Sequence, residues 1–192
     1  MGDIDDIKRV KYRYLRALDT KHWDDFADTL TEDIVGDYGS SLGEEHHFTD
    51  RDTLVEFMRS AMPANVLTEH RVTHPEIDVD GDEATGIWYL QDRVVVPEFD
   101  FMLYGAAFYH DRYRRTPDGW RISATGYKRT YEINMSTESI TRFKVKPGDA
   151  LNIRLSLCDG DQRTGLQPAN NVHKGAVIDR HASRRRTAVG GV

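Results

Sequence analysis

The sequence predicts an α+β fold in which N-terminal helices are followed by a curved antiparallel sheet. Apolar residues recur every three or four positions in two early segments, which is typical of amphipathic helices. From Val66 onward the apolar residues alternate as in strands. Turns at Asp80-Gly81 and Asp118-Gly119 divide this second part into an antiparallel meander. Such a sheet can wrap its concave face around the helices and leave a pocket between them.

The composition favours a soluble protein with one domain and a tail. The chain has 192 residues, of which 30% are charged. No apolar run approaches the roughly 20 residues of a membrane span, and the acidic N-terminus is unlike a signal peptide. The single cysteine, Cys158, cannot form an internal disulfide, so we expect a cytoplasmic protein. The chain lacks a glycine-rich phosphate loop, a Gly-x-Ser-x-Gly elbow and a Cys-x-x-Cys pair.

Charge is unevenly distributed along the chain. Residues 151–192 carry a net charge of +4. Because the whole chain has a net charge of −6, residues 1–150 carry −10. The acidic body argues against a nucleic-acid partner, which would need clustered basic residues. We expect a domain over residues 1–145 and a C-terminal arm over 146–192. Residues 143–157 could form a strand or an arm, and disorder is expected from about residue 159, with the Arg184–Arg186 triplet solvated.

The first predicted helix covers residues 4–18 and buries one apolar stripe. The stripe consists of Ile4, Ile7, Val10, Tyr14 and Leu18, and Lys8, Arg9, Lys11, Arg13 and Arg16 fill much of the remaining surface. Asp19 then lies near the C-terminal end of the helix, where the dipole disfavours a carboxylate by about 0.3–1 kcal/mol. Asp19 is therefore either a solvated turn residue or a group with a function.

Shorter elements follow before the meander. Trp23, Phe26, Ala27 and Leu30 predict a second helix, and residues 34–38 predict a short strand. The His46-His47 pair in the next loop does not predict a metal site, because neighbours on an extended chain point to opposite faces. A capping-box-like start at residues 49–52 opens a third helix that ends before Pro63, with Leu54, Phe57, Met58 and Ala61 on one face.

Four long strands are predicted at about residues 66–79, 83–96, 104–115 and 120–133. Alternation places His70 on one face with Thr68, Val72 and His74. It also places Asp92 beside Trp88 and Leu90, where a buried carboxylate needs a partner. His70 could be a core histidine bonded to the backbone or a functional base. The aromatic connection at residues 97–104 could be core or the lid of an apolar pocket.

These polar residues match the needs of an elimination without a cofactor or metal. Such a reaction needs a base that takes a proton from carbon, a group that holds the base in one tautomer, and an acid for the leaving oxygen. His70 suits the first task. Asp19 or Asp92 could orient it, Tyr14 could donate to the leaving group, and Arg129 could stabilise an oxyanion.

Several stretches resemble a known family. They read YLRALDTKHWDDFADTL, SAMPANVLTEHRVTHPEIDVD, ATGIWYLQDRVV, GAAFYHDRYRRTPDGWRI and TGYKRTYE, and lie between about residues 4 and 133. They are similar to the SnoaL-like branch of the nuclear transport factor 2 superfamily, which includes scytalone dehydratase and hexachlorocyclohexane dehydrochlorinase. Within this branch the chain looks most like the bacterial bile acid 7α-dehydratases.

The resemblance implies a cone-shaped α+β barrel, often trimeric or otherwise a homo-oligomer such as a dimer. It implies loss of water from a 7α-hydroxy-3-oxo-Δ4 steroid acid or its coenzyme A thioester, and it assigns the functional residues to Tyr14, Asp19, His70, Asp92 and Arg129. We expect Tyr38, His74, Trp88, Phe101, Tyr104, Tyr109 and Tyr127 to line the substrate pocket. Dehydrochlorination, ketosteroid-type isomerisation and a non-catalytic role as a binding or dimerisation module are the alternatives.

The spacing of the two N-terminal candidates adds one structural condition. Tyr14 and Asp19 are five residues apart, about 140° around a helix of 3.6 residues per turn. They can reach one cavity only if the helix end lies at its mouth or unwinds there.

Overall fold

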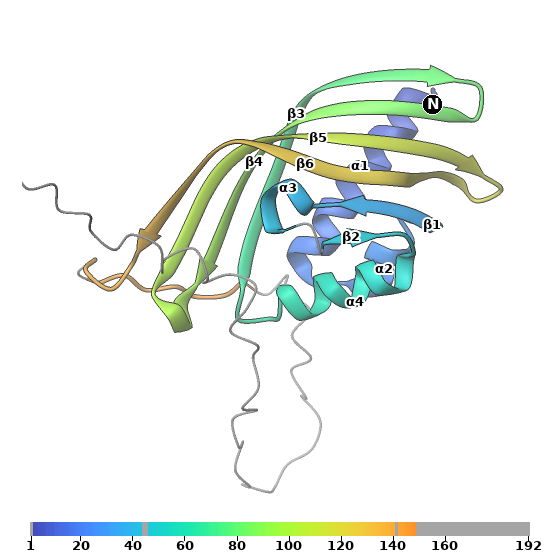
Figure 1. The fold of residues 1–192 in the computed structure, drawn as a ribbon. Helices are drawn as coiled ribbons and strands as arrows, with labels where there is room; N and C mark the ends of the chain where they lie inside the picture. The colour runs from blue at the N-terminus through green and yellow to red at the C-terminus, as the bar shows by residue number, and fades with distance from the viewer. Residues whose placement is uncertain (1, 44–45, 141, 149–192) are drawn as a thin grey trace, which may run out of the picture. The chain divides into compact units, whose positions relative to one another are not determined.

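The computed structural model describes residues 2–43, 46–140 and 142–148. The helices are α1 (Asp3–Thr20), α2 (Trp23–Ala27), α3 (Gly39–Leu42) and α4 (Arg51–Ala61), with a 3-10 turn η1 (Pro97–Phe99). The strands are β1 (Leu30–Asp37), β2 (His47–Phe48), β3 (Leu67–Asp80), β4 (Glu83–Val96), β5 (Phe101–Thr116) and β6 (Gly119–Ser136). Figure 1 shows the long strands curving past the helices. No helix within these described ranges is long and apolar enough to cross a membrane.

All six strands form one sheet in the order β2-β1-β6-β5-β4-β3. The predicted antiparallel meander is confirmed for β3 to β6, and its hairpins turn at Gly81 and Gly119, which both adopt positive φ. The sheet is mixed, because β1, which lies outside the predicted meander, pairs parallel to β6. Alternation along a strand is the same in both directions, so the direction of this long-range pairing could not be read from the sequence.

The element boundaries differ from the predicted ones at the connections. The third long strand begins at Phe101 instead of residue 104, since residues 101–104 pair with the end of β4. The predicted loop before the third helix contains α3 and β2. Helix α4 is capped by Asp50, whose Oδ1 accepts the Thr53 N–H at 2.9 Å. Most of the predicted arm and the whole basic tail, including Cys158, lie outside the described residues.

Helix α1 packs its apolar stripe against β3 and β6. Ile7, Val10, Tyr14 and Leu18 are buried as predicted, together with Leu15. They join Trp88, Leu90, Tyr109, Tyr113 and Ile122 of the sheet in one core. This packing holds α1 against the concave face and sets the position of its C-terminal end.

Lys11 was predicted to lie on the surface of α1, and this prediction was wrong, because its side chain is fully buried. Its Nζ lies 2.7 Å from Oδ2 of Asp111 and 3.4 Å from the centre of the Tyr109 ring. Burial lowers the pKa of Lys11, against the charge of Asp111. Lys11 stands four residues after Ile7 and three before Tyr14, so its position belongs to the apolar stripe.

Asp111 is the centre of this buried group. Its two oxygens also accept the hydroxyls of Tyr113 and Thr125, each at 2.8 Å. The Trp88 indole N–H in turn donates to the Tyr113 oxygen at 2.9 Å. The ion pair therefore links α1 to β4, β5 and β6 in one polar network.

Replacing Asp111 by Asn should destabilise the protein by about 3–5 kcal/mol, because the Lys11 ammonium would remain buried without a counter-charge. Urea unfolding measures this loss. The matched control is Asp33→Asn, which breaks an exposed pair with Arg114 and should cost less than about 1 kcal/mol. Equal losses in the two variants would contradict a structural role for the buried pair.

Candidate functional site

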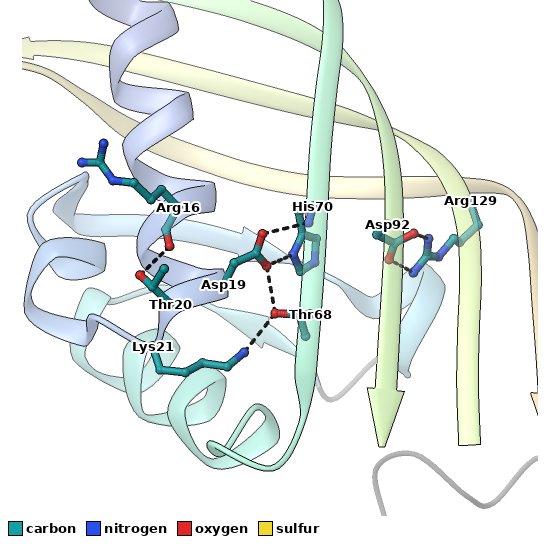
Figure 2. A network of polar contacts seen from close by, with 8 residues as sticks. All are labelled: Arg16, Asp19, Thr20, Lys21, Thr68, His70, Asp92 and Arg129. Atoms are coloured by element: carbon teal, nitrogen blue, oxygen red, sulfur yellow. Dashed lines mark hydrogen bonds and ion pairs between the residues drawn. The ribbon is translucent and has the colours of Figure 1, made fainter. Parts of the chain in front are cut away.

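The end of α1 meets β3 at a histidine–carboxylate contact. Oδ1 of Asp19 lies 2.6 Å from Nδ1 of His70, and Oδ2 accepts the backbone N–H of the same residue at 2.9 Å. Figure 2 shows the carboxylate between the helix and the strand. Because Asp19 binds both the ring and the backbone of His70, the position and the rotation of the imidazole are both constrained.

This contact determines which ring nitrogen of His70 can act as a base. A carboxylate that accepts from Nδ1 requires the proton on that nitrogen, which leaves the lone pair on Nε2. Within the part of the chain that the structure describes, Nε2 has no hydrogen-bond partner. The His70 side chain retains 10% of its exposure and that of Asp19 22%, so solvent or a ligand reaches the pair.

Thr68 also binds the carboxylate and Lys21 binds Thr68, and sequence reasoning did not assign either residue a role. The Thr68 hydroxyl donates to Oδ1 of Asp19 at 2.8 Å, and Nζ of Lys21 donates to the Thr68 oxygen at 2.9 Å. Burial lowers the pKa of Lys21 to about 8, although the negative charge of Asp19 opposes this. The sequence did place Thr68 on the face of His70, but nothing local indicated that the side chain of Lys21 turns inward.

Asp92 occupies the position opposite His70 on β4, and its partner is Arg129 of β6. The pair is bidentate, with Nη1–Oδ1 at 2.5 Å and Nη2–Oδ2 at 2.7 Å. Burial acts to lower the pKa of Arg129, but the hydrogen bonds and charges around it, led by Asp92, together raise it. Of the two aspartates that could orient His70, the structure therefore brings Asp19 to the ring and commits Asp92 to the arginine.

Gly105 makes room for this second pair. It lies opposite Asp92 on β5, and a Cβ there would come within 2.5 Å of Nη1 of Arg129 and 3.1 Å of Oδ1 of Asp92. A side chain at this position would displace the guanidinium. The pairing of Arg129 with Asp92 therefore requires a glycine at residue 105.

Tyr14 lies deeper in the core, and its hydroxyl is 3.0 Å from that of Tyr38. Burial raises the pKa of Tyr14, Tyr38 and Tyr109 well above the usual value, so these hydroxyls stay protonated near neutral pH. The Tyr127 ring packs against Tyr38 and lies 4.9 Å from the Arg129 guanidinium. Among the described residues, the Tyr14 hydroxyl bonds to Tyr38 and makes no hydrogen bond to the Asp19–His70 pair (the dyad), consistent with the angular separation of Tyr14 from Asp19.

The remaining predicted pocket residues divide between the two faces of the sheet. Trp88 and Tyr109 are buried inward, and Phe101 is half-buried at the start of β5. Tyr104 pairs with Arg93, so it lies on the face opposite Asp92 and His70, where Gln91 donates to its hydroxyl at 3.3 Å. Tyr104 therefore lies on the face opposite Tyr109, because the two are five residues apart on one strand.

His74 also differs from its predicted position. It has a φ of 49°, and the register of β3 against β4 shifts between Thr73 and Glu76. This bulge breaks the alternation, and after it Ile77 takes the inward position while the His74 side chain is exposed. His74 is followed by Pro75, which has no backbone N–H to donate to the sheet, and this proline could have indicated a bulge from the sequence.

The structure also bears on metal binding. No group of three or more His, Cys, Asp or Glu side chains that could hold a metal ion occurs among residues 2–43, 46–140 and 142–148. The charged groups nearest His70 are instead paired with one another or with hydroxyls. The chemistry that the arrangement supports is proton transfer at Nε2 of His70.

Comparisons with known proteins identify the family of the chain. A family model described as a SnoaL-like domain matches residues 1–125. The chain belongs to the SnoaL-like domain family. An uncharacterized protein of Mycobacterium tuberculosis (strain ATCC 25618 / H37Rv), Rv2910c, is 25% identical over 123 residues, which cover 64% of this chain and 82% of that protein.

Solved structures share the fold at lower identity. A scytalone dehydratase-like protein from Novosphingobium aromaticivorans is 18% identical with a TM-score of 0.61, and the match covers 73% of this chain and 95% of that one. The hexachlorocyclohexane dehydrochlorinase LinA-type3 from Novosphingobium barchaimii is 15% identical with a TM-score of 0.61, covering 73% and 92%. At these identities the likeness shows the fold alone, which is of the nuclear transport factor 2-like type.

The tautomer of His70 is directly testable by nitrogen-15 NMR. At high pH the ring should carry its proton on Nδ1, because Asp19 accepts there. In Asp19→Asn, whose amide is a weaker acceptor, the Nε2-protonated form should become populated. A neutral His70 that is protonated on Nε2 in the wild-type protein would contradict the site geometry.

Proposed function

We propose that the protein is a cofactor-independent hydro-lyase that uses His70 as its general base. The observation that carries the proposal is the 2.6 Å contact between Asp19 and Nδ1 of His70, which leaves Nε2 without a partner among the described residues. A binding module has no need for an ionisable pair of this kind at its ligand face. The contact therefore favours an enzyme over a binding or dimerisation module.

In the proposed reaction, Nε2 of His70 takes a proton from a carbon that a conjugated carbonyl makes acidic. The electron pair of the broken C–H bond forms a new C=C bond, and the hydroxyl leaves with a proton as water. Asp19 stabilises the imidazolium that forms, as a carboxylate does when it accepts from the other ring nitrogen. No oxidant, reductant or cofactor is needed to balance this step.

The remaining residues supply a proton and positive charge. Tyr14 and Tyr38 are neutral hydroxyls, and we assign Tyr14 to protonation of the leaving oxygen. Arg129 supplies positive charge for the oxygen of the carbonyl system. We assign Asp92 to holding Arg129, because its carboxylate is bound by the guanidinium and acts as an acceptor only.

The proposed substrate is an apolar, alicyclic alcohol activated by an enone, of the class of the 7α-hydroxy-3-oxo-Δ4 steroid acids. The resemblance to bile acid 7α-dehydratases motivates the ring system. Tyr38, Trp88, Tyr109 and Tyr127 are aromatic residues of the core on this side of the sheet, and we assign them to the lining of an apolar substrate pocket. A free acid and a coenzyme A thioester are the two forms to compare. The predicted homo-oligomer and the cytoplasmic location stay predictions.

Incubation with 7α- and 7β-hydroxy-3-oxo-Δ4 steroid acids and their thioesters, followed by the absorbance of the extended dienone, tests the proposal. His70→Ala should lower turnover by at least about 10²-fold. His110→Ala is the matched control, since His110 is exposed on β5, and it should retain wild-type turnover. Equal turnover in the two variants would contradict the base assignment.

A second candidate keeps the same base and changes the fate of the carbanion. The dyad acts on the proton and not on the leaving group, and the fold is shared with a dehydrochlorinase. Loss of chloride or an isomerisation would therefore use the same residues. Exchange of the acidic hydrogen with solvent deuterium, without release of water or chloride, would favour isomerisation.

A further inference from the structure

Lys21 is an unusual residue at the end of α1. It follows the helix directly and adopts the left-handed conformation, with φ of 62° and ψ of 30°, a position that favours glycine. Its residue exposure is only 4%. A glycine would close the helix with less backbone strain and without burying a charge, so helix capping alone does not explain a lysine here.

The side chain of Lys21 is directed towards the dyad. Nζ donates to the Thr68 oxygen at 2.9 Å, which leaves the Thr68 hydrogen to point at Oδ1 of Asp19, 2.8 Å away. Figure 2 shows this series of contacts from Lys21 to His70. Within the described ranges, no carboxylate oxygen lies within 4 Å of Nζ, so Lys21 contacts Asp19 through the Thr68 hydroxyl while their opposite charges also attract each other across space.

We propose that Lys21 is a positioning residue for the Asp19–His70 dyad. Its ammonium orients the Thr68 hydroxyl towards Asp19, and its positive charge keeps the proton of the pair on Nδ1 while disfavouring the imidazolium. The imidazole therefore stays in its basic form to lower pH than it would beside an unbalanced carboxylate. The consequence for turnover rests on the proposed function, whereas the consequence for the imidazole itself does not.

Three physical facts support this role. A pKa of about 8 leaves Lys21 charged through the range in which an imidazole ordinarily titrates. The ammonium acts in a part-buried environment, where charges are less screened than in water. Hydrogen bonds to a carboxylate also reduce its attraction for a proton on the partner, so the Thr68 donor and the Lys21 charge act in the same direction.

The other charged groups around His70 do not substitute for Lys21. Asp92 on β4 faces His70 but is bound by Arg129 on β6, and Glu132 lies 3.5 Å from the same guanidinium. This set is separate from the Lys21 contacts, so substitutions at Lys21 leave it in place. Lys21 influences the imidazole of His70 through Asp19, which accepts hydrogen bonds from both Thr68 and His70.

The test is an NMR titration of the nitrogen-15-labelled histidines, with the His70 signals assigned by their loss in His70→Gln. In Lys21→Met the midpoint for His70 should rise by at least about half a pH unit, because a nearby positive charge is lost. Thr68→Val, which keeps the charge and removes the hydroxyl, should move it the same way by less. Lys21→Arg should restore the wild-type midpoint, and the exposed control Lys128→Met should not change it.

A midpoint in Lys21→Met equal to or below that of the wild type would overturn the proposal. So would a shift in Lys21→Arg as large as that in Lys21→Met, since charge would then not be the cause. If Lys21→Met does not fold, Thr68→Val decides alone, and an unchanged midpoint there overturns the relay. With an active substrate, the acidic limb of kcat/KM should move by the same amount as the midpoint. If no substrate is turned over while the midpoints move as stated, the proposed function fails and this inference stands.

Discussion

The buried ion pair between Lys11 and Asp111 joins helix α1 to the sheet, and the contact between Asp19 and His70 depends on how α1 lies against the sheet. Both side chains are fully buried, so breaking the pair would leave a charge without a partner in the core. Asp19 lies eight residues after Lys11, about 12 Å along the helix at 1.5 Å per residue. A helix fixed at Lys11 can therefore bring the Asp19 carboxylate to the ring of one histidine on β3.

Two carboxylates of the sheet, Asp111 and Asp92, and one of α1, Asp19, have different partners. Asp111 binds Lys11, Asp92 binds Arg129, and Asp19 binds His70 with Thr68 and Lys21 beside it. Only the third pair contains an imidazole, which can accept and release a proton at a ring nitrogen. The first two pairs are thus suited to hold structure and supply fixed charge, and the third to transfer a proton.

Regular periodicity explains what could be predicted from the sequence. The stripe of α1 was sufficient to predict its buried face, and the alternation of β3 and β4 to place His70 beside Val72 and Asp92 beside Trp88 and Leu90. The features that were missed depend on contacts between distant segments or on local irregularity. The parallel pairing of β1 with β6, the buried charge of Lys11 and the inward turn of Lys21 belong to the first kind. The bulge at His74 belongs to the second, because one extra residue reverses the faces of all that follow.

The central claim is that His70 acts as the base, and chemical rescue tests it most directly. In His70→Ala, added imidazole can enter the space left by the ring and take the substrate proton in its place. The account predicts that turnover of this variant rises with the concentration of neutral imidazole, while the wild type is unaffected. A variant whose turnover already equals that of the wild type, or does not respond to imidazole at any pH, would contradict it.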